Sequence, residues 1–285
     1  MRFLPFLLAV MVGLPLPGAE TKKDIEYARA GEHSLALDLW LPGKAIPQAP
    51  LLVWVHGGAW RAGSKSDMPL RALVNQGYAI ASVDYRLSTE APFPAQIHDI
   101  KAAIRFLRAQ GAALGVDAAR IVICGGSAGG HLAALVGVTN GHQQLEGTVG
   151  AHPGKSSAVQ GIISFYGGSN LTTILDQSTP HGLKVRIPAL QLLLGGQPEE
   201  KPDLARLASP VFQVDAKDPP LLLFHGDQDI QMPVNQALEL QGAYEKAGLP
   251  VKLVVLHGGG HGGADFWEEA RMQDVTKFLQ SLPES

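Results

Sequence analysis

Short runs of apolar residues alternate with longer amphipathic stretches from about residue 50 to the end of the chain. Each run is nearly continuous in Val, Ile, Leu and Phe and ends in a glycine or a polar turn. This pattern is typical of strands that are buried on both faces of a parallel sheet. Runs of this kind occur at 50–58, 78–85, 120–126, 161–168, 219–227 and 251–259.

The run at 34–40 has a different pattern. Leu35, Leu37 and Leu39 alternate with other residues, so they would share one face of a strand. Strict alternation favours an antiparallel strand with one solvated face. We therefore expect two strands before the first buried parallel strand, with the second of them at 34–40.

Amphipathic helices are predicted between the strands. In the stretch 95–111, Ile97, Ile100 and Ile104 recur at helical spacing, and Gly111 is the predicted C-cap. The same helical pattern recurs at 234–248 and 265–282.

The alternation of strand and helix predicts an α/β protein with a doubly wound, mostly parallel sheet. We expect one domain over residues 20–285, because neither a repeat nor a linker interrupts the pattern. Two stretches, at roughly 139–159 and 170–218, are too long for plain connections. We expect them to form cap or rim insertions over a functional site.

Composition and charge indicate a globular protein and argue against a nucleic-acid-binding function. Apolar residues make up 46% of the chain and charged residues 17%, which is typical of a globular protein with a core. The formal net charge is −3, and no basic stripe is present, which argues against nucleic acid as a partner. The one cysteine, Cys124, ends an apolar run and is expected to be a buried, unreactive thiol, so no intrachain disulfide is possible.

The first residues have the pattern of a secretion signal. Arg2 precedes the apolar stretch 3–16, which prolines and a glycine interrupt. This stretch is too short to cross a bilayer, which takes roughly 20 helical residues. We predict a cleavable signal at 1–19, cut near Ala19, and hence a secreted or periplasmic protein without a stable membrane anchor. The alternative is a buried N-terminal helix.

The sequence CGGSAGG at 124–130 contains the pattern G-x-S-x-G around Ser127. A strand pattern precedes it and a small-residue helix pattern follows it, which is the context of a nucleophile elbow. Gly125 and Gly129, two residues on either side of the serine, would avoid collisions between the strand and the helix. We therefore predict that Ser127 is a nucleophile held in a strained turn.

Phosphate-binding loops explain the glycines less well. A dinucleotide fingerprint starting at Gly125 would require glycine where Ser127 stands, and no Walker sequence is present. The stretch 258–263 matches G-x-G-x-x-G by letter, but a single helix follows it, so no βαβ unit can form. We predict no cofactor.

A nucleophilic serine requires an acid and a base, which follow it in the order acid then histidine in this type of fold. Asp227 and Asp229 follow the strand at 219–227, and we favour Asp229 because it lies further into the loop. Asp227 is better explained as a turn residue. His257 ends the last strand, whereas His261 lies in a glycine-rich loop that can reach the serine, so we favour His261 as the base.

A metal site is disfavoured in this region. His225, Asp227 and Asp229 are spaced as possible ligands, but the sequence offers no matching ligand pair and no HExxH motif. We therefore predict no metal.

The donors of an oxyanion hole are also predicted. The backbone N–H of Ala128, directly after the nucleophile, is one donor, and the sequence HGGAW at 56–60 supplies Gly57 and Gly58 as the others. Trp60 follows these glycines and is a candidate to stack on a sugar or an aromatic acyl group. The alternative is a tryptophan of the core.

Taken together, these motifs resemble the α/β-hydrolase superfamily. HGGAW, DYRLSTEAPFPAQIHDIKAAIRFLR, CGGSAGGHLAAL, PPLLLFHGDQDIQMPVNQA and GGGHG occur in the order typical of the superfamily, over about residues 30 to 280. The closest likeness is to the hormone-sensitive-lipase-like and the bifunctional feruloyl/acetyl-xylan esterase-like carboxylesterases.

The resemblance implies Ser127, Asp229 and His261 as a catalytic triad and Gly57, Gly58 and Ala128 as oxyanion donors. It also implies a secreted serine carboxylesterase that needs no cofactor and acts on short-chain or aromatic acyl esters, often on plant polysaccharide. The partner would be a small-molecule or carbohydrate ester.

Two departures concern the substrate. GGSNL stands at 167–171, where such esterases often have G-P-T-D-L, and Ala59 stands where the loop often has glycine. Two alternative functions remain: a serine peptidase of the prolyl-oligopeptidase kind, and a non-catalytic binding protein on the same fold. The peptidases usually carry a propeller domain, whose pattern does not occur among these residues.

Overall fold

The computed structural model describes residues 20–43 and 49–283, so the predicted signal segment 1–19 lies outside the described residues. The strands are β1 (Glu20–Ala30), β2 (His33–Leu41), β3 (Ala49–Val55), β4 (Ala79–Val83), β5 (Val116–Gly126), β6 (Gly161–Phe165), β7 (Leu221–Gly226) and β8 (Val251–Leu256). The α-helices are α1 (Arg71–Asn75), α2 (Ala95–Leu114), α3 (Ala128–Gly137), α4 (Gln143–Glu146), α5 (Ile174–Gln177), α6 (Pro180–Leu194), α7 (Pro202–Leu207), α8 (Asn235–Lys246) and α9 (Glu269–Ser281). Two 3₁₀ helices, η1 (Pro210–Phe212) and η2 (Ala264–Phe266), complete the described elements.

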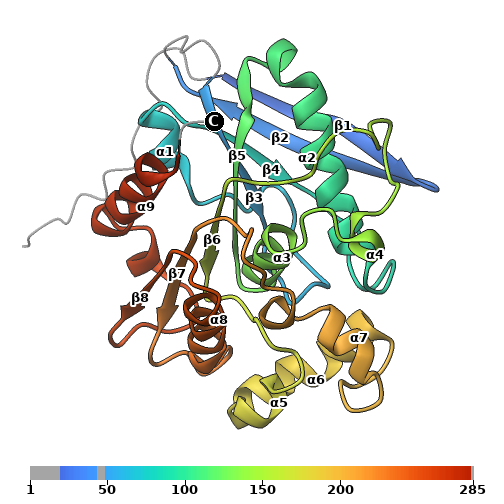
Figure 1. The fold of residues 1–285 in the computed structure, drawn as a ribbon, viewed down its shortest axis with the longest axis vertical. Helices are drawn as coiled ribbons and strands as arrows, with labels where there is room; N and C mark the ends of the chain where they lie inside the picture. The colour runs from blue at the N-terminus through green and yellow to red at the C-terminus, as the bar shows by residue number, and fades with distance from the viewer. Residues whose placement is uncertain (1–19, 44–48, 284–285) are drawn as a thin grey trace, which may run out of the picture.

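The strands form one sheet in the order β1-β2-β4-β3-β5-β6-β7-β8 (Figure 1). β1 and β2 pair antiparallel, and β2 also pairs antiparallel with β4. From β4 to β8 all neighbours are parallel. The predicted mostly parallel sheet, preceded by two strands, is confirmed.

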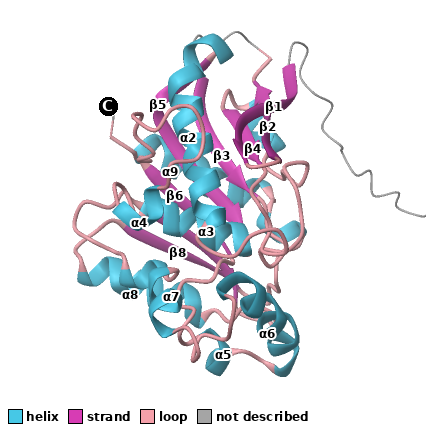
Figure 2. Cartoon of the chain, turned by 90° about the vertical axis from the view of Figure 1, so that its right-hand side faces the viewer, coloured by secondary structure: helices cyan, strands magenta, loops and turns pink. Residues whose placement is uncertain are grey.

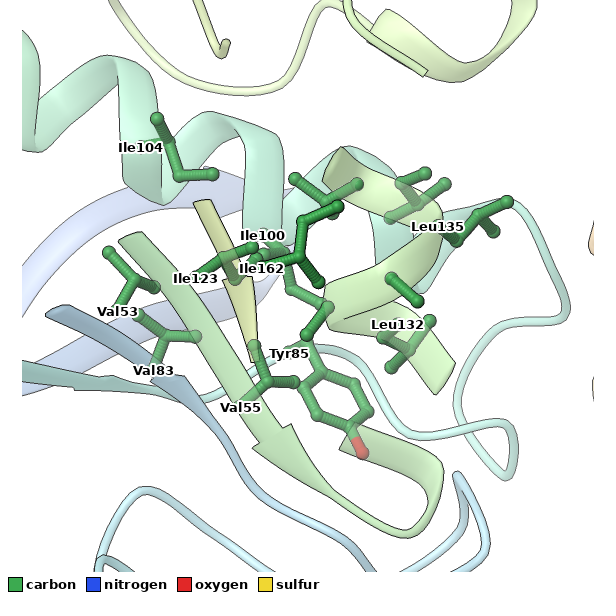
Figure 3. Packing of buried hydrophobic residues seen from close by; sticks show 14 of the residues in the cluster. Val53, Val55, Val83, Tyr85, Ile100, Ile104, Ile123, Leu132, Leu135 and Ile162 are labelled. Atoms are coloured by element: carbon green, nitrogen blue, oxygen red, sulfur yellow. The ribbon is translucent and has the colours of Figure 1, made fainter. Parts of the chain in front are cut away.

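Helices cover both faces of this sheet, as Figures 1 and 2 show. Alternate residues of β3 enter opposite layers: Val53 and Val55 pack into the core beneath α2 and α3, whereas Trp54 packs toward α1 and α9. Figure 3 shows the first of these cores, with Ile100 of α2 and Leu132 of α3 packed beside the strands. Since both faces are buried, the strand sequences are continuously apolar, and the doubly wound arrangement is confirmed.

The predicted end of helix α2 is wrong. The helix continues through Gly111 to Leu114, and Gly115 is the C-cap, with a left-handed φ of 85°. Gly111 has another role: a Cβ there would lie 2.6 Å from the Cβ of Ala118 in β5. The glycine therefore allows the helix to approach the strand closely and does not end the helix.

The stretch 139–159 does not overlie a site. It contains the short helix α4, and Glu146 at its end forms salt bridges with Lys101 and Arg105, which are buried on α2. These salt bridges hold the stretch against α2. The expectation that it forms a cap or rim over a functional site is therefore wrong.

The stretch 170–218 contains α5, α6, α7 and η1. The side chain of Thr179 at the start of α6 donates a hydrogen bond to the carbonyl of Ile230, just beyond β7. Arg186 of α6 donates to the carbonyl of Gln231 in the same loop, over 3.3 Å. This insertion therefore lies at the end of the sheet where β7 terminates (Figure 1).

The described helices include none that is both long and apolar enough to cross a membrane.

Candidate active site

The turn between β5 and α3 holds Ser127 in a strained conformation. Its φ is 55° and its ψ is −119°, values that residues other than glycine rarely adopt. A Cβ on Gly125 would lie 2.3 Å from the carbonyl oxygen of Gly129, and a Cβ on Gly129 would lie 2.0 Å from that of Val55. Only glycine fits at both positions, so the predicted strained elbow is present.

A chain of two hydrogen bonds leads from Ser127 through His261 to Asp229. His261 Nε2 lies 2.8 Å from Ser127 Oγ, and His261 Nδ1 lies 2.7 Å from Asp229 Oδ2. A carboxylate only accepts, so Nδ1 carries the hydrogen and Nε2 is free to accept the serine proton. The structure thus brings together three residues that the sequence singled out, from three different connections.

Asp229 is held as a carboxylate by donors on both of its oxygens. Its Oδ1 accepts the backbone N–H groups of Gln231 and Met232, each at 2.8 Å. Burial alone would raise the pKa of Asp229, but hydrogen bonds from His225 and His261 outweigh burial and place the pKa below the ordinary value. The carboxyl is therefore charged when it orients the histidine.

A second histidine–aspartate pair joins the same two loops. His257 Nδ1 lies 2.9 Å from Asp227 Oδ2, and the N–H of Gly258 donates to Asp227 Oδ1 over 2.7 Å. The His257 side chain is 87% exposed. Asp227 lies in a turn, as predicted, in which the N–H of Asp229 donates to the carbonyl of Gly226 over 3.4 Å. Its side chain also binds the neighbouring loop, and this pair does not reach Ser127.

Gly57 and Gly58 line the same pocket as Ser127, and Ala128 follows the serine in the chain. A Cβ on Gly57 would lie 3.4 Å from the Cβ of Ser127, and Gly58 has a φ of 102° that favours glycine. Ala128 is the first residue of α3, where a backbone N–H has no partner within the helix. Within residues 20–43 and 49–283, the N–H groups of Gly57, Gly58 and Ala128 donate no hydrogen bond.

Trp60 does not contact the site as predicted. It is fully buried, its Nε1 donates to Nδ1 of His131 over 3.1 Å, and its carbonyl accepts the N–H of Ser88 over 2.8 Å. Ala59 and Trp60 both have positive φ values, 51° and 60°, and this turn directs the indole into the core. The substrate-stacking interpretation is wrong, and the core alternative holds: Trp60 anchors the loop that carries Gly57 and Gly58.

The imidazole of His131, which accepts the hydrogen bond from the Trp60 indole, is neutral. Burial lowers the pKa of His131 to about 4. Nε2 of His131 lies 2.7 Å from the carbonyl of Ala208, so Nε2–H donates there and Nδ1 accepts from the indole.

A pocket of about 780 Å³ opens above Ser127 and His261. Sequence reasoning missed two aromatic residues that line it, Tyr166 and Trp267. The ring of Tyr166 lies edge-on to His261 with centroids 4.9 Å apart, and its φ is 41°. The sequence feature that could have identified Tyr166 is its position directly after β6, at the edge of the sheet where the other site residues lie.

The amino-acid sequence matches the BD-FAE family model over residues 37–244. The esterase LipC of Mycobacterium tuberculosis is 33% identical over 236 residues, which are 79% of this chain and 56% of LipC. The chain therefore spans little more than half the length of the curated relatives it matches.

Solved structures show the same fold. A truncated carbohydrate esterase from gut microbiota superposes with a TM-score of 0.82 at 30% identity, covering 93% of this chain and 98% of that one. Esterase 2 of Thermogutta terrifontis, solved after phosphorylation by paraoxon, superposes with a TM-score of 0.74 at 26% identity over 97% of this chain and all of that one.

The fold, the motif order and these matches agree: the chain belongs to the BD-FAE family of α/β-hydrolases.

Proposed function

We propose that this protein is a serine carboxylesterase in which Ser127, His261 and Asp229 form the catalytic triad. The observation that carries the proposal is the unbroken hydrogen-bond chain from Ser127 Oγ through both nitrogens of His261 to Asp229. The esterase names of the relatives and structural neighbours support the same reaction class.

The first half of the reaction forms an acyl-enzyme. His261 Nε2 takes the proton of Ser127 as Oγ bonds to the ester carbonyl carbon. The carbonyl oxygen becomes negative and accepts hydrogen bonds from the N–H groups of Gly57, Gly58 and Ala128. The bond to the alcohol oxygen then breaks, and His261 protonates the departing alcohol.

The second half releases the acid. His261 takes a proton from water as the water oxygen attacks the acyl carbon, and the bond to Ser127 Oγ breaks with return of the proton to the serine. Asp229 holds the imidazole in the required tautomer and stabilises it while it is charged. Both half-reactions use only water together with the side chains and backbone of this chain.

The proposed substrates are short-chain or aromatic acyl esters, including acetyl and feruloyl groups on plant polysaccharide. One structural neighbour is described as a carbohydrate esterase, which supports this choice. Export is part of the proposal and rests on the pattern at 1–19; amino-terminal sequencing of the exported protein tests it by locating the cleavage near Ala19.

Hydrolysis of p-nitrophenyl acetate by the wild type and by Ser127→Ala tests the reaction class. We expect the variant to lose at least about a thousandfold in kcat, as removal of a triad nucleophile does in other enzymes. Equal rates would end the proposal. Hydrolysis of an alanine anilide without ester hydrolysis would instead support the peptidase alternative.

A further inference from the structure

The catalytic pocket has an aromatic wall that the reaction itself does not use. Trp267 lies on the connection between β8 and α9, the connection that also carries His261, and it lines the pocket together with Ser127. Its side chain is partly exposed, whereas Trp54 in the same wall is buried. A partly exposed aromatic ring in a catalytic pocket offers its apolar surface to a ligand.

Neighbouring rings hold Trp267 in place. Its centroid lies 4.8 Å from that of Phe165, and its ring meets Trp54 edge-on at 6.0 Å. A rigid ring loses little conformational entropy when a ligand stacks on it. The indole N–H of Trp267 has no acceptor among residues 20–43 and 49–283 and is not buried, so it can also donate to a ligand.

Contacts between aromatic rings connect this wall to His261, which protonates the departing alcohol. Tyr166 lies edge-on to His261, Phe266 lies edge-on to Tyr166 with centroids 4.7 Å apart, and Phe266 is next to Trp267. His261 gives its proton to the oxygen of the departing alcohol, so the alcohol part of the ester must lie on the side of His261. Because ring contacts through Tyr166 and Phe266 link Trp267 to His261, we assign Trp267 to that side.

The polar residues of the pocket indicate what kind of alcohol fits. Arg61 and Asp67 also line it, and they provide one positive and one negative charge. Within the described part of the chain, Arg61 forms no salt bridge. Asp67 accepts one backbone N–H, from Ser64 over 3.1 Å. A donor and an acceptor in the same pocket as an apolar ring suit sugar hydroxyls, which both donate and accept, better than an alkyl chain. The opposite charges of Arg61 and Asp67 together favour neither sign of charge on the ligand.

We propose that Trp267, together with Arg61 and Asp67, forms a subsite that holds the neutral sugar ring of an acylated carbohydrate on its alcohol side. This inference rests on the proposed esterase function and names the part of the substrate that the pocket recognises.

Steady-state kinetics of Trp267→Ala test the subsite. Three substrates are compared: partially acetylated xylo-oligosaccharides, methyl 6-O-acetylglucoside and ethyl acetate. We expect KM for at least one carbohydrate ester to rise about tenfold, the effect of roughly one stacking contact. The change in kcat/KM for ethyl acetate should be several times smaller, because its ethyl group offers no ring to stack on the indole, whereas the aromatic alcohol of p-nitrophenyl acetate could stack there. Trp267→Phe should restore part of the loss.

The matched control is Phe212→Ala, which removes a partly exposed aromatic ring outside the pocket and should leave all three substrates unchanged. Equal effects of Trp267→Ala on all three esters, or no effect on any, would overturn the subsite. A selective loss on methyl ferulate, added as a fourth substrate, would also overturn it, because it would place the acyl group on Trp267. Failure of the esterase function is seen separately, as p-nitrophenyl acetate hydrolysis that survives Ser127→Ala.

Discussion

His261 Nε2 lies 2.8 Å from Ser127 Oγ, although the two residues are 134 positions apart in the chain. The sheet produces this proximity, because β5 and β8 run parallel and their carboxyl ends meet one edge. Ser127 follows β5 and His261 follows β8. Asp229 follows β7, which lies between β5 and β8 in the sheet, and its carboxylate binds His261.

Replacement of Asp229 by asparagine should abolish most activity without unfolding the protein. The amide cannot hold Nδ1–H of His261 as the carboxylate does, so the wrong tautomer is favoured, and we expect kcat to fall by about a thousandfold or more. Ester hydrolysis with p-nitrophenyl acetate measures the change.

Asp227→Asn is the matched control, because Asp227 binds His257 in the same two loops but away from the serine. Its kcat should remain within about twofold of wild type. If the two asparagine variants lose activity equally, Asp229 has no special role.

The elbow should not tolerate a methyl group at Gly125. Its Cβ would lie 2.3 Å from a backbone oxygen that cannot move without shifting α3, so Gly125→Ala should cost at least about 1–3 kcal/mol of stability and lower kcat. Denaturant unfolding and ester hydrolysis measure the two effects.

Gly242→Ala provides the comparison for this substitution. Gly242 lies in α8 with open space around it, so alanine should stabilise the protein by about 0.5–1 kcal/mol through its helix propensity. A stable and fully active Gly125→Ala variant would show that the close packing of the elbow is not required.

Stability should fall in acid because of His131. Its pKa is about 4 in the folded protein and about 6.5 when exposed, so the unfolded chain binds more protons between these values. Stability from this residue is complete above pH 6.5 and is lost as the pH falls toward 4, by about 2–3 kcal/mol at pH 4.5.

Urea unfolding of wild type and His131→Gln at pH 7.5 and pH 4.5 isolates this contribution. The difference in unfolding free energy between the two proteins should shrink in acid. A difference that is the same at both pH values would mean that His131 takes up its proton normally in the folded state.

The sequence was sufficient for the elements that depend on local pattern. Continuous apolar runs predicted the parallel strands, and the order of Ser127, Asp229 and His261 predicted which side chains would meet. The choice of Asp229 over Asp227 followed from its position deeper in the loop, which the structure explains by the N–H groups of Gln231 and Met232 that hold its carboxylate.

The positions that depend on tertiary packing could not be predicted from the sequence. Trp60 follows the oxyanion glycines, yet two left-handed residues turn it into the core toward His131. Trp267 lines the pocket instead, although it lies within a stretch that reads as an ordinary amphipathic helix. Gly111 has the sequence signal of a helix end, but it serves the contact with Ala118.

Covalent labelling of Ser127 tests the central claim most directly. The protein is incubated with a fluorophosphonate and digested, and the modified peptide is located by mass spectrometry. We predict one adduct, on Ser127, with loss of ester hydrolysis in proportion to labelling and no adduct in Ser127→Ala. An active protein that labels at another residue, or that loses no activity when Ser127 is labelled, would contradict the account.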